Sequence, residues 1–250
     1  MPTPLQSLVL FFGLFANWAV AADELIARAL QAENSWETET ALQLLLQAEK
    51  RRPDDAFILQ KIARQYSDSI EEQPNKIAKI RRAHLALDYA RRAVELEPNN
   101  AVNVLSVAIT HGKLAVLSST REKVRYAWLI KQNAERAIEL DPDYAWAHHV
   151  LGRWHRELSA LGPTARWFAR LLFGEIPPAS LKEAVAQFQR AIELDPENPN
   201  HHIELGFTYL AIGQESDAQR QFELGLSKPS VERYDEQTKE YARRALGARG

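Results

Sequence analysis

Apolar residues recur along this chain at three- and four-residue spacing, and three of these stretches end in an acidic residue followed by proline. The spacing places the apolar side chains on one face of a helix. The acid–proline step ends that helix, because the residue before proline is driven out of the α region. No alternating apolar–polar run is long enough to indicate a strand. The pattern therefore predicts a chain that is almost entirely helical.

A short phrase recurs within this pattern. It reads Ala-Val-Glu-Leu-Glu-Pro at residues 93–98 and Ala-Ile-Glu-Leu-Asp-Pro at residues 137–142 and 191–196. Weaker copies end at Pro53 and Pro229. Self-similarity at this scale indicates a stack of helical repeats. Such stacks present extended binding surfaces, so the pattern favours a binding protein over an enzyme.

The last full repeat carries the most complete pattern. Leu205, Gly206 and Tyr209 fall on a first helix, and Ala218 and Phe222 fall on a second. Small residues allow the two helices to cross closely, while the aromatic residues fill the space between them. This arrangement resembles the tetratricopeptide repeat (TPR), in which a helix pair of this kind is the repeating unit.

The predicted fold is all-α: a right-handed TPR superhelix with insertions between helices and a C-terminal capping helix. We expect one domain over residues 22–250. Tyr234, Tyr241 and Leu246 are expected to point inward from the capping helix. The expected helix pairs are residues 23–53, 56–98, 101–142, 145–196 and 199–229, and the expected cap is residues 231–246.

The spacing between the repeat prolines is uneven. It is 45, 44, 54 and 33 residues, whereas a plain repeat of this type has about 34. Three units therefore carry insertions of about 10, 10 and 20 residues, which we expect between their two helices. Insertions in such arrays lie at one edge, often the binding edge.

The N-terminal segment is predicted to be a secretory signal peptide over residues 1–21. An apolar run at residues 8–20 is followed by small residues and then by Asp23. Cleavage would start the mature chain near Ala22 and place the protein in the periplasm or outside the cell. Two alternatives stay open: a buried first helix, or an uncleaved membrane anchor, although the run is shorter than the roughly 20 residues that a membrane span needs.

A second, more specific resemblance rests on the longest insertion. Leu-Gly-Arg-Trp at residues 151–154 precedes Trp-Phe-Ala-Arg-Leu-Leu-Phe-Gly at 167–174, Pro-Pro at 177–178 and Leu-Lys-Glu-Ala at 181–184. Over residues 55–225 this combination resembles the regulator of microtubule dynamics family. The resemblance implies a helical adaptor without catalytic residues. Animal members are linked to microtubules, and one to membrane contact sites with lipid binding by its TPR domain.

In TPR proteins certain first-helix positions line a concave groove, and the resemblance implies the same here. The matching positions would be apolar, with arginines near the middle. Arginine suits carboxylate or phosphate, and an apolar stretch suits an acyl chain or an amphipathic helix. We hypothesise a ligand with an acidic head and an apolar body; alternatively, Arg153 and Arg156 pair with neighbouring acids. The positions are Phe57, Gln60, Arg64, Val102, Leu105, Ile109, Trp146, His149, Arg153, Arg156, Asn200, Ile203, Phe207 and Leu210.

The insertion at residues 161–181 has three interpretations. A helix starting near Thr164 and ending at Gly174 would group aromatic and aliphatic residues apart from basic ones. It could form a lid over the groove, touch a membrane surface, or pack as an additional core helix. The residues concerned are Trp167, Phe168, Arg170, Leu171 and Phe173.

Composition narrows the choice of function. The net charge is −2, with 31 basic and 33 acidic residues interleaved, so no tract indicates nucleic acid binding. The absence of cysteine excludes disulfides, thiol catalysis and cysteine metal sites. His148 and His155 lie two turns apart, about 10 Å, which is too far to ligate one ion. We therefore predict no metal, no cofactor and no catalytic site.

The sequence predicts a non-catalytic TPR adaptor that binds a protein or peptide partner in the cell envelope. The first alternative is a lipid-binding or lipid-transfer protein that uses the groove and the insertion. The second is a microtubule-associated regulator, as in the animal relatives. An open groove would favour a peptide, whereas an enclosed apolar pocket under Trp167 and Phe168 would favour a lipid.

Overall fold

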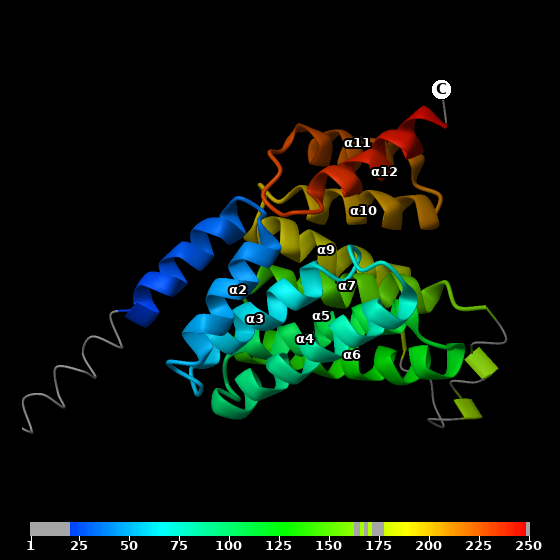
Figure 1. Ribbon diagram of the computed structural model, residues 1–250. Helices are drawn as coiled ribbons and strands as arrows, with labels where there is room; N and C mark the ends of the chain where they lie inside the picture. Colours follow the sequence, from blue (N-terminus) through cyan, green and yellow to red (C-terminus); the bar gives the residue numbers. More distant parts are fainter. Residues whose placement is uncertain (1–20, 163–165, 168–169, 172–177, 249–250) are drawn as a thin grey trace, which may run out of the picture. The chain divides into compact units, whose positions relative to one another are not determined.

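A computed structural model describes residues 21–162, 166–167, 170–171 and 178–248, and all regular structure in that part of the chain is helical (Figure 1). The chain divides into two compact units, Met1–Pro98 and Asn99–Gly250. The division falls at Pro98, one of the repeat prolines. Each unit is built from antiparallel helix pairs of the TPR type.

The first unit contains a helix over residues 21–34, followed by α2 (Thr38–Glu49), α3 (Ala56–Asp68) and α4 (Lys76–Leu96). Helix α3 packs against both α2 and α4. The core contains Leu25, Ala29, Leu42, Leu44, Leu45, Ala48, Ile58 and Ile62.

The described part of the second unit contains three helix pairs and a cap. Helix α5 packs on α6, α7 on α9 and α10 on α11, and α12 packs on both α10 and α11 (Figure 1). Helix α7 also contacts α5 and α10. The first helices of the three pairs, α5, α7 and α10, therefore pack side by side in the order of the sequence. The bounds are α5 (Ala101–Leu117), α6 (Thr120–Leu140), α7 (Ala145–Ser159), α9 (Leu181–Leu194), α10 (Pro199–Ala211), α11 (Glu215–Ser227) and α12 (Asp235–Gly247).

Polar residues after the repeat prolines fix where the first helices begin. The side chain of Asp55 accepts a hydrogen bond from the backbone N–H of Ile58 at 3.1 Å, and that of Asn100 accepts from Val102 at 3.0 Å. These bonds satisfy amide groups that have no partner within the helix. Helices α3 and α5 therefore begin where the sequence predicts, at residues 56 and 101. Helix α7 also begins at its predicted residue, 145, although no side chain caps it.

Glycine lets the paired helices cross closely, as predicted. A Cβ atom placed on Gly206 would lie 2.7 Å from the ring of Phe222, and one on Gly152 would lie 3.1 Å from the ring of Phe188. Both rings are fully buried. The recurrent glycine thus makes room for an aromatic ring of the second helix.

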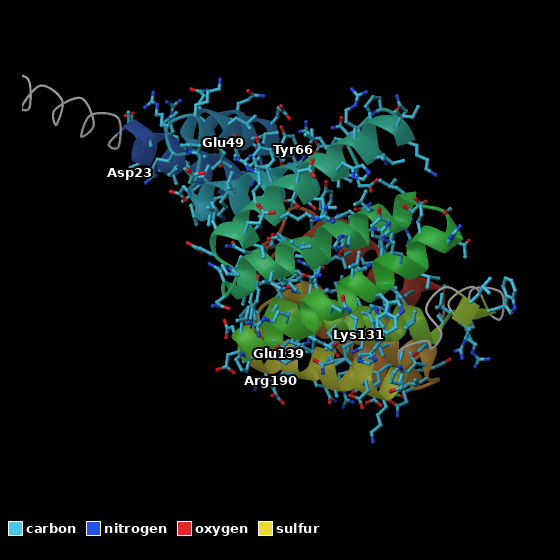
Figure 2. All side chains as sticks on the ribbon, turned by 90° about the horizontal axis from the view of Figure 1, so that it is seen from below. Asp23, Glu49, Tyr66, Lys131, Glu139 and Arg190 are labelled. Carbon is cyan, nitrogen blue, oxygen red and sulfur yellow. The ribbon has the colours of Figure 1, made fainter. Side chains whose placement is uncertain are left out.

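A recurrent arginine ties α6 and α9 to the turns that precede their helix pairs. Arg136 donates to Asn99 Oδ1 at 3.2 Å, and Arg190 donates to Asp143 Oδ1 at 2.7 Å. Each arginine also pairs with a glutamate three residues later, at 3.1 Å. Figure 2 labels Glu139 and Arg190 from these two sets. The recurrent glutamates thus neutralise arginines that hold the ends of the repeats.

The extra length of the repeats is not placed as predicted in every unit. Only residues 118–119 separate α5 from α6. The repeat formed by these two helices is therefore long because the helices themselves have 17 and 21 residues. Apolar positions continue to the helix ends, which extends the pairing of the two helices. Helix α4 is likewise 21 residues long, after a connection at residues 69–75. The long insertion does lie between α7 and α9, at residues 160–180.

The cap differs from the prediction in its start and in its inward face. Helix α12 begins at Asp235, and its buried side chains are Asp235, Lys239 and Ala242. Tyr241 is exposed, so the prediction that it points inward is wrong, whereas Leu246 does pack on the core of this end. The charged residues are tolerated inside because each is hydrogen-bonded.

No helix in the described part of the chain combines the length and the apolar character that crossing a membrane requires. The predicted signal peptide lies outside the described residues, except for Ala21. Its cleavage, and the envelope location that depends on it, stay predictions.

Candidate binding face on the first helices

The outward side chains of α5, α7 and α10 form one face of the second unit, because α7 contacts both of its neighbours. We call it the first-helix face. It is aliphatic on α5, mixed on α7, and acidic and aromatic on α10. Its members are Val102, Ser106, Ile109, Lys113 and Val116 on α5, Trp146, Val150, Arg153, Arg156 and Glu157 on α7, and Asn200, Glu204 and Phe207 on α10.

Four of the groove residues predicted on these helices do not belong to this face. Leu210 is partly buried and packs on the core of the last repeat. Leu105 and Ile203 are fully buried, and His149 is almost completely buried. They are core residues, and their assignment to the groove was wrong. Successive residues of a helix point about 100° apart, so the next position along each helix faces outward instead. That shift adds Ser106, Val150 and Glu204, which the TPR register does not identify.

Glu204 holds both predicted arginines. Arg156 Nη2 lies 2.5 Å from Glu204 Oε2, and Arg153 Nε lies 3.8 Å from Glu204 Oε1. Arg153 also pairs with Glu157 at 3.0 Å. The charge of Glu204 raises the pKa of Arg153 above its usual value. The arginines thus pair with neighbouring acids, and the cluster of two cations and two anions has no net charge.

A buried histidine pair joins α7 to α10 below this face. His149 Nδ1 lies 2.8 Å from His201 Nδ1, and both rings contact Trp146. Burial lowers the pKa of His149 well below its usual value and lowers the pKa of His201 to about 4. Both rings are therefore neutral at pH 7, with one nitrogen donating and the other accepting. The carboxylate of Asp195 lies 4.0 Å from His201 Nε2.

The remaining histidines of these helices have structural partners. His148 contacts Gln187 Oε1 at 2.7 Å and the carbonyl of Pro142 at 3.0 Å. His202 makes the equivalent contacts one repeat later, with Gln221 and the carbonyl of Pro196. His155 is buried, and its ring lies edge-on to that of Trp154. Among the described residues, no three His, Asp or Glu side chains are arranged to hold a metal ion.

In the first unit, Phe57 occupies the position that corresponds to Val102 and Trp146, and its side chain is exposed. Gln60 and Arg64 are half-buried. Glu33 organises the surrounding charges: it pairs with Lys61 at 2.9 Å and with Arg64 at 3.4 Å. Lys61 also lies over the ring of Phe57. Basic side chains thus gather around one glutamate in this unit too.

The described residues in the middle of the long insertion are exposed. The exposed fractions of Trp167 and Leu171 are 58% and 64%, and Arg170 is also exposed. These residues do not pack as part of a core helix, so that interpretation is wrong for them. Arg166 donates to the carbonyl of Leu161 at 3.0 Å, which holds Arg166 near the end of α7. Phe168 and Phe173 lie outside the described residues.

The loop before the cap reaches across to α5. Lys113 Nζ lies 5.5 Å from the centre of the Tyr234 ring. The buried Asp235 holds this loop, because it accepts hydrogen bonds from Asn200 Nδ2 at 2.5 Å and from the backbone N–H groups of Val231 and Glu232. The cap is therefore connected to both α10 and α5.

The model of a protein family described as regulator of microtubule dynamics protein 1-3 matches residues 23–249. The chain belongs to this family. It is 26% identical to human regulator of microtubule dynamics protein 2 over 210 residues, which is 83% of this chain and 51% of the human protein. It is 29% identical to the mouse protein 1 over 197 residues, which is 76% of this chain and 62% of the mouse protein. The chain thus spans about half the length of protein 2.

Among solved structures, a thermophilic TPR protein from Thermus thermophilus has a similar fold. The TM-score is 0.66 at 20% identity, and the match covers 90% of this chain and 99% of that protein. The likeness confirms the predicted all-α, TPR-like fold.

Proposed function

We propose that this protein is a non-catalytic adaptor of the cell envelope that binds a segment of a partner protein on the first-helix face. The observation that carries the proposal is the surface of α5. Val102, Ile109 and Val116 all lie on one side of this helix, with exposed fractions of 41%, 37% and 72%. An apolar strip bordered by charged residues is typical of a protein-binding site.

The charged part of the face supports a peptide more than a small anion. Arg153 and Arg156 already pair with Glu204 and Glu157, so a lone carboxylate or phosphate would have to compete with two acids. A protein segment can instead bury apolar side chains on α5 and supply both acidic and basic groups to α7. Affinity would then come from apolar burial, and the charges would select the partner.

Site-specific photocrosslinking in the native host tests this proposal. A benzophenone side chain is placed at Val116, and at Ile77 in α4 as an equally exposed apolar control. We expect one dominant adduct from position 116 and none of the same mass from position 77. Recovery in the envelope fraction, with an N-terminus near Ala22, is expected if the segment 1–21 is a cleaved signal. The same adduct from both positions would contradict binding at the first-helix face.

Lipid binding is a second candidate, favoured by the exposed Trp167 and Leu171 beside Arg166 and Arg170. Aromatic and basic residues in one short segment are suited to a membrane surface or a lipid headgroup. Native mass spectrometry of protein purified from its host would reveal a bound phospholipid or fatty acid. Its loss in the double variant Arg153→Ala, Arg156→Ala would assign the headgroup to the first-helix face.

The names of the relatives suggest a third candidate, a regulator of microtubule dynamics. It requires the protein to be in the compartment that contains microtubules, with an unprocessed N-terminus. Co-sedimentation with microtubules, combined with fractionation of the host, tests it. An envelope protein that does not sediment with microtubules would exclude this candidate.

A further inference from the structure

Helix α5 differs from the other first helices in the regularity of its exposed side. Its outward aliphatic residues are Val102, Ile109 and Val116, each seven residues from the next, with Ser106 and Lys113 between them. The equivalent residues of Val102 and Ile109 are Trp146 and Arg153 on α7, and Asn200 and Phe207 on α10. A strip of three aliphatic residues thus runs along the length of α5.

A seven-residue period is the repeat with which one α-helix packs along another. On α5 it corresponds to steps of about 10.5 Å along the helix axis. A partner helix with apolar residues at heptad spacing stays in register with all three steps. The side chains on one face of an extended strand recur instead about every 6.8 Å. They would not match the spacing of Val102, Ile109 and Val116. The spacing therefore selects a helical partner.

The charge of α5 indicates which residues should flank the apolar side of the partner helix. The helix contains no aspartate or glutamate, and its one charged residue is Lys113, which lies in the strip. Acidic residues that flank the apolar side of a partner helix would meet Lys113, whereas basic residues at the same place would be repelled.

We infer that the first-helix face binds an amphipathic α-helix of a partner protein, which lies along α5 with aliphatic residues at heptad spacing and acidic residues on its flank. This inference rests on the proposed adaptor function and specifies its partner. The anchors on α5 are Val102, Ile109 and Val116, and Lys113 provides the charge selection.

The probe is a fluorescein-labelled peptide of three heptads, with leucine at a and d, glutamate at e and g, and alanine elsewhere. Like charges at e and g discourage the peptide from pairing with itself. Two further peptides serve as controls, one with lysine at e and g and one with the glutamate sequence scrambled. Fluorescence anisotropy with the full-length protein measures each affinity.

We expect the glutamate peptide to bind, and the lysine and scrambled peptides to bind at least about tenfold more weakly. Ile109→Glu should weaken the glutamate peptide by about tenfold or more, whereas Ile77→Glu on α4 should leave it within about twofold. Circular dichroism of each variant shows whether it is folded. Equal binding of the scrambled peptide, or no effect of Ile109→Glu, would overturn the inference.

A charge exchange tests the role of Lys113. Lys113→Glu should weaken the glutamate peptide and strengthen the lysine peptide. Because Lys113 also contacts Tyr234, Tyr234→Ala serves as the control; if it reproduces the exchange, the charge of Lys113 is not the cause. If photocrosslinking at Val116 captures a partner while no peptide binds, the adaptor function stands and the helical partner is excluded.

Discussion

At the scale of single residues, Trp36 and Gly213 occupy the same place in two turns that join a first helix to a second. Both have positive φ, 61° for Trp36 and 79° for Gly213. In both turns the next backbone N–H returns to a carbonyl five residues earlier, from Glu37 to Ala32 and from Gln214 to Tyr209. This closure of a helix end requires a left-handed residue, which glycine adopts without strain and tryptophan does not.

Replacement of Trp36 by glycine should raise the free energy of unfolding by about 1 kcal/mol, because it removes left-handed strain. The matched variant Gly213→Ala should lower it by about 1 kcal/mol. A Cβ atom at Gly213 would meet nothing within 4 Å, so the loss of stability in Gly213→Ala would come from the backbone conformation alone. Urea denaturation measures both. A less stable Trp36→Gly protein would show that contacts of the indole ring outweigh the strain.

The His149–His201 pair should make the protein sensitive to acid. Both histidines have a folded-state pKa below the unfolded value of about 6.5, so their contribution is complete above pH 6.5 and is lost as the pH falls toward 4. For His201 alone, a fall in pKa to about 4 corresponds to about 3 kcal/mol over that interval.

Chemical denaturation at pH 7 and at pH 4.5 tests this prediction. The double variant His149→Leu, His201→Leu removes both titrating rings, and leucine already occupies the position of His149 in the preceding repeat, at residue 105. We expect this variant to lose less stability than the parent between the two pH values. An equal loss in both proteins would assign the acid sensitivity to other groups.

At the scale of helix pairs, glycine decides how closely α10 and α11 approach. A Cβ atom on Gly225 would lie 2.6 Å from Ile203 Cγ1 and 3.0 Å from the carbonyl oxygen of Pro199. Gly225→Ala should therefore cost about 2 to 3 kcal/mol, since backbone and core must move apart. Gly112→Ala is the control, because no atom lies within 4 Å there. It should stabilise α5 by about 0.5 to 1 kcal/mol. Similar effects of both variants on the thermal midpoint would contradict this account.

The cap shows why the pattern alone misplaced an element. Apolar periodicity suggested an inward Tyr241, yet the buried positions of α12 include Asp235 and Lys239. Lys239 Nζ donates to the carbonyl of Lys228 at 2.6 Å and to Ser230 Oγ at 3.0 Å, so it holds the preceding loop. A charged residue that is buried because a loop surrounds it has no signature in the spacing of apolar residues.

At the scale of the whole molecule, the repeat made the fold predictable and the face only partly so. Proline and the capping residues Asp55 and Asn100 mark helix starts locally, so those starts were predicted correctly. One position on each of α5, α7 and α10 was assigned a residue too early, because a repeat helix carries apolar residues on both its core side and its binding side. Leu105 and Ile109 are alike in sequence, and only the packing of α5 on its neighbours distinguishes them.

The repeat architecture also predicts how far a local change spreads. In a stack of repeats each unit contacts its neighbours in sequence, so stability is close to a sum of unit and neighbour terms. In this protein α10 contacts α7, α9, α11 and α12, whereas α2 and α3 pack within the first unit. Gly225→Ala should therefore increase local opening in α10, α11 and α12 and leave the helices of residues 21–96 unchanged.

Hydrogen–deuterium exchange of the native protein, resolved by peptide mass spectrometry, measures that spread. Faster exchange confined to residues 199–247 would agree with additive repeats, because opening there breaks only the neighbouring interface. The matched variant Leu45→Ala, in the core of the first unit, should accelerate exchange in α2 and α3 and leave α12 unaffected. If either variant accelerates exchange evenly over the whole chain, the protein unfolds as one cooperative body. A partner helix on α5 would then influence both ends of the molecule rather than its neighbouring repeats alone.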